Sequence, residues 1–125
     1  MKRAMFETLV RRAIERLPKR FRDHLGTVEF VIQDRASPEL LASLEIPPEE
    51  DDLLGFYDGV PITERSDFDG APIPVTDTIY LFQKALEEMC ASEDELVEEI
   101  RVTVLHEIGH HFGFDDDEIE RLGYG

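Results

Sequence analysis

A long amphipathic helix is predicted over residues 93–112, and it constrains the fold more than any other segment. Ser92 followed by Glu95 is a capping-box pattern at its start, and Gly113 stands where such a helix ends. Its apolar side chains recur every four residues, at Leu96, Ile100, Val104, Ile108 and Phe112. One face of this helix must therefore be buried against other elements.

Further helices and strands are predicted from hydrophobic spacing. Apolar residues three and four apart indicate a helix over residues 3–17, which Pro18 ends. Segments rich in β-branched and aromatic residues predict strands at 27–33, 53–58 and 77–83. Shorter features are a helix begun by Ser37 and Pro38, a helix over 84–89 and a loop over 66–74. No repeat or break in composition divides the chain, so we expect a single domain over residues 1–125.

The charge of the chain excludes two classes of partner. Against 13 Lys and Arg stand 29 Asp and Glu, a formal net charge of −16, which repels nucleic acid and anionic membranes. Most of the basic residues lie in the first 22 positions, where we expect them to pair with the acidic body of the same domain. A single cysteine, Cys90, and the lack of a continuous apolar segment predict a cytoplasmic protein, for which a monomer is favoured.

The last two turns of the predicted helix carry a His-Glu-x-x-His motif. His106 and His110 are four residues apart, so on a helix both imidazoles can reach one cation. Glu107 follows the first histidine, where its carboxylate could take a proton from a metal-bound water. In a helical projection Glu107 lies closer to the apolar stripe than the histidines, so we expect burial to raise its pKa.

A third ligand is expected just beyond the helix. Gly113 tolerates a left-handed backbone conformation and can turn the chain back, so that Asp116 reaches the metal. The neighbouring acids Asp115, Asp117 and Glu120 are alternatives. Two imidazoles and one carboxylate leave a position open for water, which is typical of catalytic rather than structural zinc sites.

A different metal chemistry uses the same ligand types. Two histidines and a carboxylate also describe the facial triad of non-haem iron oxygenases. Glu107 argues against that alternative, because a carboxylate beside the ligands that shuttles protons serves hydrolysis by bound water.

With these residues the chain resembles the bacterial minimal zincin-like metallopeptidase family. The resemblance rests on His-Glu-x-x-His-x-x-Gly-x-x-Asp over 106–116, and on the segments 59–66, 77–83 and 115–124. It implies an α+β fold in which a small mixed sheet packs against the active-site helix and the N-terminal helix. It also implies Zn²⁺ bound by His106, His110 and Asp116, with Glu107 as the general base.

The sequence thus predicts a zinc-dependent peptidase that hydrolyses peptide bonds through a metal-activated water. Its partner would be a peptide or protein substrate, and an exposed edge of the strand at 77–83 could hold that peptide by backbone pairing. The alternative is a non-enzymatic interaction module on a zincin scaffold, either stabilised by a metal or free of metal.

Overall fold

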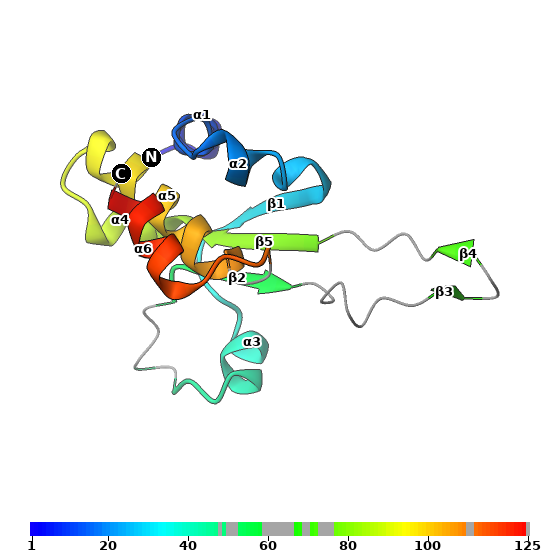
Figure 1. Cartoon of the computed structure of the whole chain (residues 1–125). Coiled ribbons are helices and arrows are strands. Elements are labelled where there is room, and N and C mark those ends of the chain that lie inside the picture. The colour runs from blue at the N-terminus through cyan, green and yellow to red at the C-terminus, as the bar shows by residue number, and fades with distance from the viewer. Residues whose placement is uncertain are drawn as a thin grey trace.

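Three strands form a mixed sheet with β5 (Asp77–Phe82) at its centre. In the computed structural model of the chain, which describes residues 1–47, 49, 53–58, 67–68, 71–72, 77–109 and 112–124, the strand order is β1–β5–β2 (Figure 1). β1 (Val28–Gln33) runs parallel to β5, with Val28 opposite Asp77. β2 (Gly55–Asp58) runs antiparallel, with Gly55 opposite Leu81. Both long sides of β5 are therefore occupied.

The central position of β5 contradicts the expectation of an exposed edge at 77–83. The two neighbouring strands occupy the edges of β5, and its two faces are covered by separate cores, which favours a continuous apolar run over strict alternation. Ile79 and Leu81 enter the larger core on one face, and Tyr80 and Phe82 enter a smaller core on the other. Among the residues that the structure describes, the outer strands of this sheet are β1 and β2.

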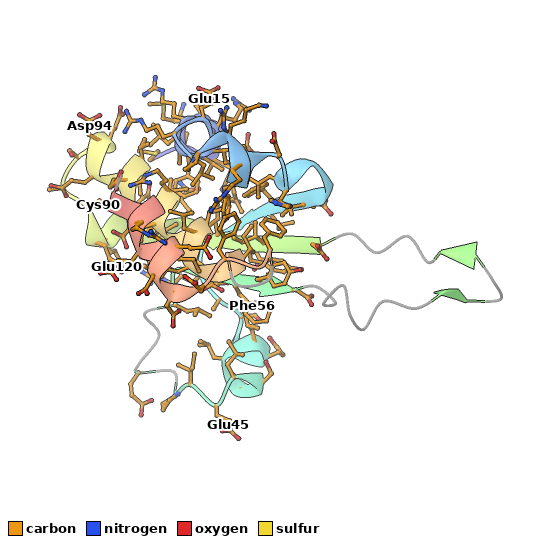
Figure 2. The ribbon with its side chains drawn as sticks, in the orientation of Figure 1. Glu15, Glu45, Phe56, Cys90, Asp94 and Glu120 are labelled. Carbon is orange, nitrogen blue, oxygen red and sulfur yellow. The ribbon has the colours of Figure 1, made fainter. Side chains whose placement is uncertain are left out.

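Helices cover both faces of the sheet. The larger core joins α1 (Arg3–Glu15) and α5 (Glu93–Ile108) to the sheet, and its fully buried side chains include Phe6, Leu9, Ile100, Val104 and Ile108. The smaller core lies under α3 (Pro38–Ser43) and includes the buried Leu41 of that helix and the partly buried Phe56 of β2. Figure 2 shows Phe56 on the side of the sheet that faces α3. Figure 1 shows α1 and α3 on opposite sides of the sheet.

The remaining helices and strands are short. They are α2 (Lys19–Arg22), a 3₁₀ turn η1 (Leu25–Thr27), β3 (Asp67–Phe68), β4 (Ala71–Pro72), α4 (Gln83–Met89) and α6 (Asp116–Tyr124). No helix in the described part of the chain is long and apolar enough to cross a membrane.

Most predicted elements are present, with one error in a segment expected to be loop. The predicted caps are confirmed: Ser37 accepts a hydrogen bond from the amide of Leu40, and Ser92 accepts one from the amide of Glu95. Residues 67–68 and 71–72, within the expected loop 66–74, pair as a two-stranded antiparallel sheet. Asp69-Gly70, a dipeptide typical of hairpin turns, separates the two strands in the sequence.

Candidate metal centre

His106 lies near the C-terminal end of α5 and is exposed. Its Nδ1 is 2.9 Å from the carbonyl oxygen of Val102, one turn earlier. A carbonyl oxygen only accepts, so Nδ1 carries a proton, and in the neutral ring Nε2 keeps its lone pair. Histidines that bind metals are commonly held in this way, with the second ring nitrogen donating to a carbonyl or carboxylate. His106 is thus oriented and in the correct tautomer to bind a cation through Nε2.

Glu107 is half-buried between α5 and the sheet. Burial raises the pKa of its carboxyl above the usual value, as the helical projection predicts. A hydrogen bond from the backbone of Tyr57 and the nearby charge of His106 act in the opposite direction. The carboxylate is therefore partly withdrawn from water and held by a backbone group.

The hydrogen bond from Tyr57 places Glu107 at the free edge of β2. The carbonyl of Leu54 accepts a hydrogen bond from the amide of Phe82, so Leu54, Phe56 and Asp58 direct their backbone groups toward β5. Tyr57 alternates with these residues, and its amide points away from β5. The carboxylate of Glu107 therefore lies beside the side of this strand that faces away from β5.

Gly55 allows β2 to lie directly on α5. A Cβ atom at Gly55 would be 2.9 Å from Cγ2 of Thr103 and 3.0 Å from the carbonyl oxygen of Tyr80. Thr103 is one turn before Glu107 on the same helix, so this close approach fixes the edge of the sheet above the predicted base.

A left-handed turn connects α5 to α6. Gly113 has a φ of +90°, as its position beyond the motif predicts, and the amide of Phe114 donates to the carbonyl of Gly109 at 3.1 Å. This six-residue pairing is that of a Schellman motif. α5 itself ends at Ile108 and not at the predicted Phe112, although the amide of Phe112 still donates to Ile108 at 3.2 Å.

Asp116 is exposed at the first position of α6. Its neighbour Asp115 caps that helix: Oδ1 accepts from the amide of Glu118 at 2.8 Å, and Oε1 of Glu118 accepts from the amide of Asp115 at 3.3 Å. This reciprocal pair is a capping box. Of the two adjacent aspartates, Asp115 therefore already has a structural role.

The structure describes three of the four predicted site residues. His106 and Glu107 are adjacent on α5, and Asp116 follows the turn. His110 and its neighbour His111 lie outside the described residues. Within the described part of the chain no three His, Cys, Asp or Glu side chains are grouped closely enough to hold a metal ion. The complete ligand set thus stays a prediction.

An aromatic cluster that the sequence does not reveal packs on the turn. The Phe21 ring lies 5.5 Å from that of Phe112 and 5.4 Å from that of Phe114. The exposed ring of His24 stacks on that of Phe112, with the ring centres 5.0 Å apart. The guanidinium of Arg20 lies 4.8 Å from the centre of the Phe114 ring. The N-terminal segment thus supports the turn after the motif, through contacts almost a hundred residues apart in the sequence.

The basic N-terminal segment pairs with the acidic body at only a few points among the described residues. Arg3 pairs with Asp34 at 2.6 Å, and Arg20 pairs with Glu118 at 3.0 Å. The second pair joins the N-terminal segment to α6, close to the candidate third ligand.

Comparison with known proteins identifies the family. No curated protein matches the chain. Residues 25–125, which include β1, the motif and α6, match the family described as zincin-like metallopeptidases, whereas α1 and α2 precede the matched region. Because the match covers most of its length, this chain belongs to the zincin-like metallopeptidase family.

Proposed function

We propose that this protein is a zinc-dependent peptidase in which His106, His110 and Asp116 bind the metal and Glu107 is the general base. The observation that carries the proposal is the hydrogen bond from Nδ1 of His106 to Val102, which leaves Nε2 with its lone pair on an exposed side chain. The half-buried carboxylate of Glu107 is on the next residue. Membership of a metallopeptidase family supports the same reading.

The donor atoms suit zinc. Imidazole nitrogen and carboxylate oxygen are common zinc ligands, and three protein ligands leave one position open in a tetrahedral site. When bound there, zinc would supply a Lewis acid that polarises the peptide carbonyl and makes the attacking water more acidic.

Glu107 would move the proton in this reaction. Its carboxylate accepts a proton as water attacks the carbonyl carbon, and it returns that proton to the amide nitrogen as the C–N bond breaks. The hydrogen bond from Tyr57 keeps the carboxylate in one place during this exchange. A base held by a backbone group needs little reorganisation before it can act.

The free edge of β2 is the surface that best suits an extended peptide. An added strand pairs through backbone groups that point away from the sheet, and in β2 those of Gly55 point that way, whereas the outward amide of Tyr57 is bonded to Glu107. Base and peptide would thus be positioned by the same strand. This assignment replaces the strand at 77–83, which is central.

The test is to measure zinc content and proteolysis on the same preparation. We expect about one zinc per chain, together with cleavage of a denatured protein substrate that stops when a chelator removes the metal and returns when zinc is restored. Bound zinc without cleavage would contradict the peptidase and favour a metal-stabilised interaction module. A purified protein that neither holds nor takes up zinc would contradict the metal site itself.

A further inference from the structure

Gly109 lies inside the motif, one residue before the second predicted histidine, and it is buried. Its φ of −58° and ψ of −45° are ordinary helical values. An alanine could adopt the same backbone conformation, and in a helix it would be more favourable than glycine. The glycine therefore needs a reason outside its own backbone.

That reason is a lack of space between α5 and Ile119 of α6. A Cβ atom at Gly109 would lie 2.5 Å from the carbonyl oxygen of Leu105, one turn earlier, and 2.7 Å from Cδ1 and 2.8 Å from Cγ1 of Ile119, all well inside van der Waals contact. Ile119 is only 2 % exposed and belongs to the larger core, so it has little room to move aside. Gly109 is thus a notch, a place without a side chain, at the C-terminal end of α5, and the buried side chain of Ile119 from α6 fills it.

The contact between Gly109 and Ile119 lies close in sequence to two predicted ligands, His106 and Asp116. On α5, His106 is three residues before Gly109, and on α6, Asp116 is three residues before Ile119. Residues three apart on a helix are neighbours on its surface, so the contact between Gly109 and Ile119 joins the side of α5 that carries His106 to the side of α6 that carries Asp116. The turn between the two helices is short, and the hydrogen bond from Phe114 to Gly109 anchors it at the same residue.

We propose that Gly109 is a positioning residue of the metal centre: by admitting Ile119, it sets the distance of approach of α6 and so brings Asp116 to the metal. This inference rests on the proposed zinc site. Ligands must be held to within about half an ångström for tight coordination, so a methyl group that pushes α6 outward should weaken metal binding.

The test is a comparison of zinc affinity in four proteins: the parent, Gly109→Ala, Ile119→Ala and the double variant. Affinity is measured by competition with a chromophoric chelator. We expect Gly109→Ala to weaken zinc binding by about tenfold or more, as changes in the residues that support a metal ligand usually do. The double variant should recover part of this loss, because removing the Ile119 side chain relieves its contact with the new methyl group, whereas the contact with the carbonyl oxygen of Leu105 remains.

Two further measurements separate positioning from general loss of stability. Gly26→Ala is the matched control, since a Cβ at Gly26 meets nothing within 4 Å, and it should bind zinc as the parent does. The visible spectrum of the protein loaded with Co²⁺ reports coordination geometry, and it should change in Gly109→Ala and move back toward that of the parent in the double variant.

Each outcome decides the inference. If the parent binds zinc and Gly109→Ala binds it with the same affinity, this inference is overturned and the proposed function is not. A double variant that binds more weakly than Gly109→Ala would show that the two side chains act independently, and would also overturn it. A parent that binds no zinc would overturn the proposed function and this inference together.

Discussion

The carboxylate of Glu107 on α5 accepts a hydrogen bond from the backbone of Tyr57 at the free edge of β2. This contact joins two residues fifty positions apart and relates the helix of the motif to the strand that could hold a peptide. It also holds a carboxylate in a half-buried place, which is unfavourable for its charged form. A carboxylate kept where it destabilises the fold is typical of a functional site.

Glu107→Gln tests the role of this carboxylate in the reaction. The amide keeps the shape of the side chain and can still accept from Tyr57, but it cannot take a proton from water. We expect peptidase activity to fall by about a hundredfold or more, with zinc content unchanged. Glu99→Gln, on the same helix two turns earlier, is the matched control and should keep full activity. Equal rates for the Glu107 variant and the parent would refute the role of the base.

The same substitution should stabilise the protein when metal is absent. Because the pKa of Glu107 is raised in the folded state, folding favours its neutral form. Below the ordinary pKa of glutamate the carboxyl is neutral in both states and has no effect. As the pH rises through the raised pKa, the folded state has to hold a half-buried charge and loses stability.

Urea denaturation in the presence of a chelator measures this effect. Glu107→Gln should have a higher midpoint than the parent at neutral pH, and the difference should vanish at a pH below the ordinary pKa of glutamate. A lower midpoint at neutral pH would show that the charged carboxylate stabilises the fold.

The contribution of Glu98 to the stability of the fold has the opposite dependence on pH. Hydrogen bonds from the buried guanidinium of Arg101 lower the pKa of Glu98, and the charge of Arg101 adds to the effect. The stabilisation is complete above the ordinary pKa of glutamate and is lost as the pH falls through the lowered value. Since Glu98 is itself exposed, Glu98→Gln should reduce the free energy of unfolding at neutral pH by about 1 kcal/mol or less.

Unfolding at neutral and at acidic pH checks this prediction. The difference between Glu98→Gln and the parent should shrink as the pH falls. Glu99→Gln is the control, because it replaces the carboxylate of the next residue on the same helix and leaves the pair between Glu98 and Arg101 in place. A difference that does not change with pH would exclude the ion pair as its cause.

The backbone conformation at position 113 requires a glycine, whereas at position 109 the conformation is ordinary and the lack of space requires one. A Cβ atom at Gly113 would meet nothing within 4 Å, but the φ of +90° is unfavourable for any residue with a side chain. Gly113→Ala should therefore lower the free energy of unfolding by about 1–2 kcal/mol. Gly113→Asn should lower it less, since asparagine adopts positive φ more readily. Thermal unfolding of both variants measures this order, and an alanine variant as stable as the parent would contradict it.

Features with a local cause were predictable from the sequence. The caps at Ser37 and Ser92 depend on residues three positions away, and the left-handed turn depends on Gly113 alone. The buried stripe of α5 follows from its own spacing. The direction of the pKa shift of Glu107 was predictable for the same reason, because the helix decides which side chains face the core.

Features that depend on distant contacts were not predictable. Whether β5 lies at the edge or the centre depends on which strands join it, and the sequence of β5 does not contain that information. Part of the crowding that excludes a side chain at Gly109 comes from Ile119 on the next helix. The aromatic cluster around Phe21 brings together residues near the two ends of the chain. The hydrogen bond from Tyr57 to Glu107 likewise exists only after β2 has been placed over α5.

The most direct test of the central claim is a crystal structure of the protein with zinc added. We expect one zinc ion at about 2.0–2.2 Å from Nε2 of His106, from His110 and from a carboxylate oxygen of Asp116, with Nδ1 of His106 still bonded to Val102. Glu107 should lie near the ion without binding it. Zinc bound elsewhere, or these three side chains directed away from one another, would contradict the account.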